Sequence, residues 1–100
     1  MATGHLNTDG LARMARRVAE EVAGPGVFAD VAVEPTLDSL DRETHTFTFL
    51  VTPEAVGRPL GDIRLRLGRG LWDAMLADGE VPPPAIRLFG REGWDRLRRA

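Results

Sequence analysis

The sequence predicts an α+β fold: a single-layer, mostly antiparallel sheet of three to four strands with helices packed on one face. Three observations predict it. Apolar residues at helical spacing open the chain, alternating apolar and polar stretches follow, and glycine or proline separates the stretches. Strands with one apolar face each are typical of an antiparallel sheet that helices cover on one side. The expected order of elements is helix, strand, strand, strand, helix, strand, helix.

The length of 100 residues predicts a single domain over residues 1–100. Residues 1–7 are small and polar, and we expect them to form a flexible N-terminal arm. The first helix is predicted over residues 8–23, where Thr8 or Asp9 can cap the first turn. Its apolar stripe consists of Leu11, Met14, Ala15, Val18 and Val22.

Two strands are predicted next, because apolar residues alternate with period two. The first covers residues 27–34 and is expected to end at Pro35. Residues 36–43 form a polar connection. The second strand covers residues 44–52, with phenylalanines on one face and a row of threonines on most of the other. The two strands can pair antiparallel across the connection.

The segment after the second strand has two interpretations. Residues 62–67 alternate perfectly between apolar and charged residues, which favours a third strand. One long helix also fits, but it would contain Gly68 and Gly70, each costing about 1 kcal/mol relative to alanine. We therefore expect a strand over 62–67, a turn and a short helix over 70–78. The long helix, whose apolar stripe would be Leu60, Ile63, Leu67, Leu71 and Met75, stays the alternative.

The last part of the chain predicts a strand and a helix. Pro82-Pro83-Pro84 is a stiff, extended connector that leads into a strand over residues 85–89. Residues 91–99 predict a terminal helix, with Trp94 and Leu97 packed inward. Its C-terminal arginines complement the helix dipole.

Charge is distributed unevenly between the two halves of the chain. The 13 basic residues are all arginine, and 15 acidic residues give a net charge of −2. Residues 1–57 carry four arginines against nine acidic residues, a net −5, and residues 58–100 carry nine against six, a net +3. The basic half either pairs internally with the acidic half or forms a contact surface. The chain has no apparent targeting segment and no membrane-spanning stretch, so we expect a cytoplasmic protein that does not contact membranes.

Few side chains offer catalytic chemistry. The absence of cysteine excludes disulfides, thiolate metal sites and cysteine nucleophiles. Ser39 is the one serine and lacks a strained turn that would present it as a nucleophile. Oxygen and imidazole ligands gather in the polar connection, but their spacing matches no calcium loop. These weak metal candidates are Asp38, Asp41, Glu43 and His45, and we expect neither a resident metal nor a cofactor.

One family resemblance bears on function. Residues 31–37 (VAVEPTL), the strand after them, Ile63-Arg64 and residues 84–89 (PAIRLF) follow one another in an order similar to that of bacterial ribosome-binding factors with a KH-like fold. The resemblance implies a kinked helix over residues 62–78 and binding to RNA. The alanine-any-glycine motif at which that family's helix bends has no clear counterpart in this chain.

The leading hypothesis is a small non-catalytic protein–protein interaction module, such as a subunit, adaptor or inhibitor. A KH-like RNA- or ribosome-binding protein is the alternative, and a small-ligand-binding or enzymatic domain is the second alternative. The expected contact surface is the outer face of the sheet, which could also pair two copies as a homodimer. Its residues are Thr46, Thr48, Arg64, Arg66, Arg87 and Phe89.

Overall fold

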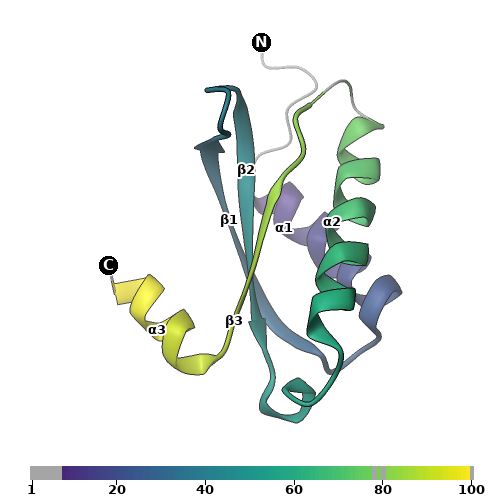
Figure 1. Cartoon of the computed structure of the whole chain (residues 1–100), viewed down its shortest axis with the longest axis vertical. Helices are drawn as coiled ribbons and strands as arrows, with labels where there is room; N and C mark the ends of the chain where they lie inside the picture. The colour runs from purple at the N-terminus through teal and green to yellow at the C-terminus, as the bar shows by residue number, and fades with distance from the viewer. Residues whose placement is uncertain (1–7, 78, 80, 100) are drawn as a thin grey trace.

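The computed structural model describes residues 8–77, 79 and 81–99, and it shows the predicted α+β class (Figure 1). The N-terminal arm expected over residues 1–7 lies outside the described residues. None of the described helices is long and apolar enough to cross a membrane. The elements follow one another as α1 (Thr8–Ala23), β1 (Phe28–Leu37), β2 (Glu43–Val51), the 3₁₀ turn η1 (Pro53–Ala55), α2 (Leu60–Leu76), β3 (Ala85–Phe89) and α3 (Arg91–Arg99).

The described strands form one mixed sheet in the order β1-β2-β3. β1 and β2 pair antiparallel, as the sequence predicted, but β2 and β3 are parallel. Parallel neighbours require a crossover connection, and α2 supplies it by carrying the chain back along the sheet. The sheet is therefore mixed rather than mostly antiparallel.

The segment over residues 62–67 is helical, so the predicted third strand is wrong and the alternative of one long helix is right. α2 buries Ile63, Leu67, Leu71 and Met75, which lie four residues apart and therefore share one face of the helix. Leu65 would share a face with Ile63 and Leu67 in a strand, but its side chain is 69% exposed. The short helix predicted over 70–78 is the C-terminal part of α2 for the residues described.

Close packing against α1 explains why residue 70 of α2 is a glycine. A Cβ atom at this position would lie 2.9 Å from the Cγ1 atom of Val18 on α1. The missing side chain lets the two helices pack closely against each other. The cost in helix propensity that argued against the long helix is thus offset by packing between α1 and α2.

β1 continues through Pro35 to Leu37, although the sequence predicted its end at Pro35. Pro35 lies opposite His45 on β2. β1 is an edge strand, and an edge strand accepts proline where the nitrogen points away from its neighbour. The connection between the two strands is correspondingly shorter than predicted.

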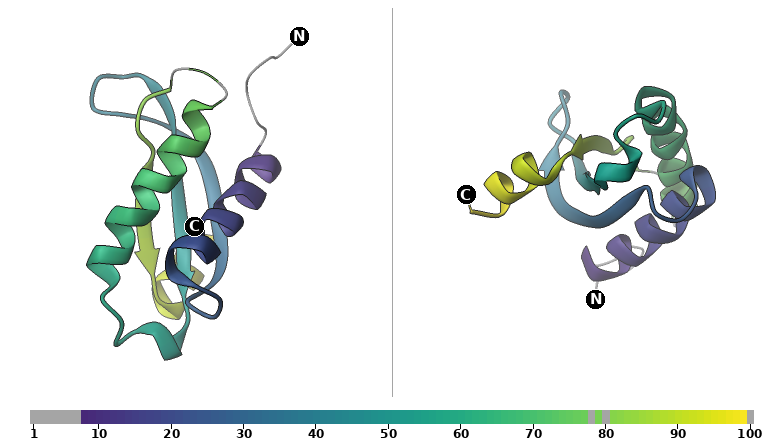
Figure 2. Two further views of the ribbon diagram at one scale, coloured as in Figure 1. Left: turned by 90° about the vertical axis from the view of Figure 1, so that its right-hand side faces the viewer. Right: turned by 90° about the horizontal axis from the view of Figure 1, so that it is seen from below.

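The helices lie on both sides of the sheet. Figure 2 shows α1 and α2 together on one face and α3 on the opposite side, so the prediction of helices on one face holds for α1 and α2 only. The core lies between β2 and the first two helices, where Phe47 and Phe49 are almost completely buried. On the other side, Trp94 of α3 is buried as the sequence predicted, and α3 contacts β2 and β3.

Candidate interaction surface

The threonine row of β2 lies beneath other side chains of the outer sheet face. Thr46 is 6% exposed and Thr48 is 1% exposed. Glu34 on β1 and Arg87 on β3 reach toward each other, with 3.7 Å between Glu34 Oε1 and Arg87 Nη2. Because β2 lies between those two strands, this ion pair passes over the threonines. Thr46 and Thr48 therefore offer almost no surface to a partner.

Arg64 and Arg66 lie on α2, so their predicted place on the sheet face is wrong. Residues i and i+2 of a helix are rotated by about 200° relative to each other, so the side chains of Arg64 and Arg66 point to different sides of α2. Arg66 forms an ion pair with Asp62 and points toward α1, where its Nη1 donates to the Val22 carbonyl at 3.4 Å. Arg64 points toward β3, where its Nε donates to the Ile86 carbonyl at 3.2 Å.

The two predicted residues on β3 do lie on the outer sheet face. The guanidinium of Arg87 sits 5.6 Å from the centre of the Phe89 ring, a cation–π arrangement. The structure thus places Arg64 and Arg87 on two sides of one strand, while Arg66 lies apart from them. That any of these residues contacts a partner stays a prediction.

An open groove of about 830 Å³ surrounds the start of β3. One wall belongs to α2 and carries Arg64, Leu65, Arg69 and Trp72. Residues of the β1–β2 hairpin line the opposite side, and the chain from Pro83 to Arg87 passes between the two walls. We call this feature the α2–β3 groove. It combines apolar surface with three arginine side chains, those of Arg64, Arg69 and Arg87.

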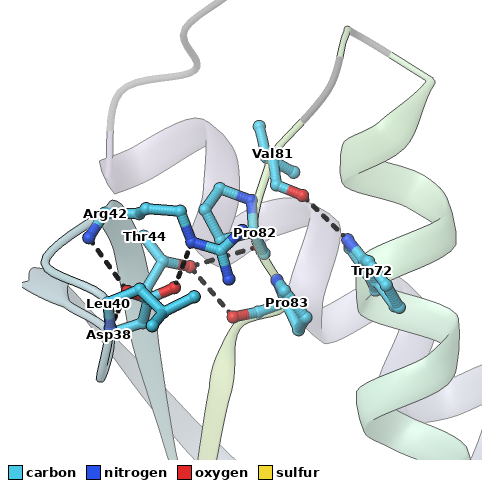
Figure 3. Close-up of polar contacts among 8 residues, drawn as sticks. All are labelled: Asp38, Leu40, Arg42, Thr44, Trp72, Val81, Pro82 and Pro83. Carbon is cyan, nitrogen blue, oxygen red and sulfur yellow. Dashed lines mark hydrogen bonds and ion pairs between the residues drawn. The ribbon is translucent and has the colours of Figure 1, made fainter.

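Hydrogen bonds from both walls fix the proline connector at one end of the groove (Figure 3). Trp72 Nε1 donates to the Val81 carbonyl at 3.0 Å. From the other side, Thr44 Oγ1 is 3.4 Å from the Pro82 carbonyl and 3.2 Å from the Pro83 carbonyl. Prolines have no N–H group, so the connector is held through its carbonyl oxygens. The start of β3 is thereby positioned between the hairpin and α2.

The candidate metal ligands of the hairpin are arranged to form a turn. Asp38 Oδ1 accepts from the main-chain N–H of Arg42 at 2.9 Å, and Oδ2 accepts from Arg42 Nε at 2.8 Å. The hydrogen bond from the Arg42 main chain lowers the pKa of Asp38 below its ordinary value. Asp41 takes a left-handed backbone conformation with φ of 59°. Among residues 8–77, 79 and 81–99, no three His, Cys, Asp or Glu side chains are grouped to hold a metal ion.

The other two candidate metal ligands, Glu43 and His45, lie on β2. Glu43 is exposed at the start of β2, opposite Leu37, and His45 lies opposite Pro35.

A smaller hollow of about 190 Å³ lies between the end of α1 and the start of β1. Small-molecule pockets in proteins usually measure about 300–1,000 Å³. Two charged residues of its lining, Arg16 and Asp30, are paired with each other at 3.1 Å. The hollow therefore gives the small-ligand interpretation little support.

The contact surface expected from the sequence left out three side chains of the α2 wall: Leu65, Arg69 and Trp72. They recur at i, i+4 and i+7, so they fall on one face of α2 once the segment is read as a helix. The strand interpretation of residues 62–67 separated Leu65 from the other two. The signal was present in the sequence, as a second stripe beside the buried one.

No protein-family model matches the chain, and a search of curated proteins finds no match.

Proposed function

We propose that this chain is a small non-catalytic binding module that contacts a protein partner through the α2–β3 groove. The observation that carries the proposal is the composition of the groove: the apolar side chains of Leu65 and Trp72 lie beside three arginines. Leu65 is 69% exposed and Trp72 is 37% exposed. Exposed apolar side chains with arginine and tryptophan nearby are typical of protein interfaces.

The charges of the groove indicate a partner segment rich in acidic residues. Among the ion pairs of the described residues, none involves Arg69, and Arg64 donates to a carbonyl rather than to a carboxylate. Arg87 makes a long ion pair of 3.7 Å with Glu34. The Asp38 carboxylate at the hairpin side is already bound by Arg42. Complementary carboxylates on a partner would therefore meet guanidinium groups that the fold leaves available.

RNA is the second candidate ligand. One observation favours it: the resemblance to KH-like ribosome-binding factors implied a kinked helix over residues 62–78, and most of that segment is helical in α2, Leu60–Leu76. Its guanidinium groups could contact phosphates, and Trp72 offers a ring on which a base could stack. The net charge of −2 favours the protein partner, because proteins that bind through phosphate contacts are usually basic overall.

The proposal is tested by selecting binders from a displayed library of random peptides. We expect enrichment of peptides rich in aspartate and glutamate on the wild-type chain, and loss of that enrichment on a variant carrying Arg64→Glu and Arg69→Glu. The matched control carries Arg13→Glu and Arg17→Glu, which make the same charge change on the exposed face of α1. The control should select the same peptides as the wild type.

Three results would contradict the proposal: no enriched peptides on a folded wild-type chain, enrichment of basic peptides, or equal enrichment on the groove variant. A titration with a single-stranded RNA oligonucleotide at low and high salt tests the second candidate. Binding that weakens steeply with salt, and that the groove variant abolishes, would favour RNA over a protein partner.

A further inference from the structure

The sheet has two edges, and they differ in what they offer to another strand. On the β1 edge, Pro35 has no N–H group to donate, and the pairing register shifts between Phe28 and Asp30. A proline and a bulge are two of the devices by which proteins prevent pairing at an edge. β3 contains neither device between Ala85 and Phe89.

The register shows which groups of β3 point to its free edge. Pro35 cannot donate, so its pair with His45 belongs to the non-hydrogen-bonded kind of antiparallel pair. The two kinds alternate along the ladder, so Phe47 and Phe49 of β2 direct their main-chain groups toward β3. These two residues lie beside Ile86 and Leu88, respectively.

In a parallel pair of strands, the main-chain N–H and C=O of one residue bond to the residues just before and just after the one that lies beside it. β3 therefore pairs with β2 through Ala85, Arg87 and Phe89. The main-chain groups of Ile86 and Leu88 point away from the sheet. The hydrogen bond from Arg64 Nε to the Ile86 carbonyl supports this assignment independently, because that carbonyl must face outward to reach α2.

Arg64 occupies one of the two outward carbonyl acceptors of the edge, that of Ile86. An arginine held over an edge carbonyl protects the edge, and it can leave when a carboxylate competes for the guanidinium. Among the described residues, no hydrogen-bond partner meets the outward groups of Leu88. The free edge thus offers the N–H groups of Ile86 and Leu88 and the carbonyl of Leu88, and it would offer the Ile86 carbonyl once Arg64 leaves it.

We propose that an extended, acidic segment of a partner protein adds to β3 as a fourth strand. The inference rests on the proposed function and names its mode of binding. Alternate side chains of the added strand would point to the α2 wall, where Leu65 and Arg69 lie, and to the outer face, where Ala85 and Arg87 lie. Main-chain hydrogen bonds supply affinity in this mode of recognition, and the side chains on either side supply specificity.

The probe is a short peptide of alternating glutamate and valine, and the reference peptide has lysine in place of glutamate. We expect the acidic peptide to bind more tightly than the basic one. Methylating those peptide nitrogens that face β3 should weaken binding at least about tenfold, because it removes the main-chain donors and leaves every charge in place. Methylating the nitrogens on the opposite side should change the affinity little.

Hydrogen exchange on the unmodified chain gives the second measurement. The amides of Ile86 and Leu88 should become protected when the acidic peptide binds. The amide of Val33 on the β1 edge is the matched control and should exchange at an unchanged rate. A Leu88→Pro variant removes one edge donor, but the methylated peptides give the decisive result because they leave the protein intact.

The outcomes separate this inference from the proposed function. If the peptide binds and Arg64→Glu with Arg69→Glu abolishes binding, but methylation and exchange show no effect, strand addition is wrong and the groove remains the contact surface. Equal protection at Val33 would also overturn strand addition at β3. If no acidic peptide binds, either as this probe or from the displayed library, the proposed function fails together with the inference.

Discussion

At the scale of single residues, Asp38 organises the β1–β2 hairpin. Its carboxylate accepts from the main-chain N–H groups of Leu40 and Arg42 at 2.8 and 2.9 Å, and from Arg42 Nε at 2.8 Å. Asparagine would keep one oxygen for the main-chain donors but would lose the oxygen that binds the guanidinium, and alanine would lose all three bonds. We expect the Tm to fall from wild type to Asp38→Asn and further to Asp38→Ala in thermal unfolding at neutral pH. Asp41→Asn is the control and should melt like the wild type, because asparagine also accepts the left-handed conformation of that position.

The Asp38 variants also test how the stability of the folded chain depends on pH. The pKa of Asp38 is lowered from its ordinary value of 3.8, chiefly by the hydrogen bond from the Arg42 main chain. A depressed carboxyl pKa stabilises the folded chain above the unfolded-state pKa, and that stabilisation is lost as the pH falls through the folded-state value. The Tm difference between wild type and Asp38→Asn should therefore be constant near neutrality and shrink below pH 3.8. A difference that grows on acidification would contradict this assignment, as would an Asp38→Ala variant that melts with the wild type.

At the scale of elements, Gly68 and Gly70, two of the three glycines of α2, have different packing environments. A Cβ atom at Gly68 would lie 3.6 Å from Ile86 Cγ1, an ordinary contact, whereas one at Gly70 would lie 2.9 Å from Val18 Cγ1. We expect Gly68→Ala to raise the free energy of unfolding by up to about 1 kcal/mol through helix propensity. Gly70→Ala should lower it by about 1–3 kcal/mol, because the β-branched Val18 side chain on α1 has little freedom to move aside.

Chemical denaturation of the two single variants measures this contrast. Gly61→Ala is a useful reference, since nothing lies within 4 Å of a Cβ atom there. Stabilisation by Gly70→Ala would show that α1 and α2 are packed less closely than the structure indicates.

The same element shows where prediction from the sequence succeeded and where it failed. α1, β2, β3 and α3 were predictable because periodicity and terminal signals agreed within each segment. Residues 62–67 fit both the period of a strand and the period of a helix. Local helix propensity favoured the strand, because the close packing that Gly70 permits depends on contact with α1 and is not visible in the local sequence. The same error placed Arg64 on the sheet face instead of in the groove, and it left Leu65, Arg69 and Trp72 out of the expected contact surface. Burial of Thr46 and Thr48 could not be predicted from β2 alone, because Glu34 and Arg87 pair across β2 from distant parts of the chain and α3 packs against β2 and β3.

At the scale of the whole molecule, the uneven charge of the two halves persists in the fold. Among the ion pairs of the described residues, Arg87–Glu34 joins the basic half to the acidic half. The others are formed within one half, and most link residues four apart on the chain, such as Arg66–Asp62 and Arg91–Asp95. The acidic half therefore does not neutralise the basic half by pairing, which leaves arginines such as Arg69 to face a partner.

The whole molecule should also unfold as one unit, although α3 lies apart from the other helices (Figure 2). Trp94 anchors α3 with 3% of its surface exposed, and Arg98 covers its ring at 5.9 Å from the centroid. Trp72→Phe would leave Trp94 as the remaining tryptophan of the two in the sequence, so its fluorescence would report on α3. We expect its thermal transition to coincide with that seen by far-ultraviolet circular dichroism, which reports mainly on α1 and α2, as required for two-state unfolding. Trp94→Ala should lower the free energy of unfolding by about 3–5 kcal/mol, the usual cost of deleting a buried tryptophan. A fluorescence transition that precedes the circular dichroism transition would show instead that α3 separates first and that the groove beside β3 belongs to a smaller folding unit.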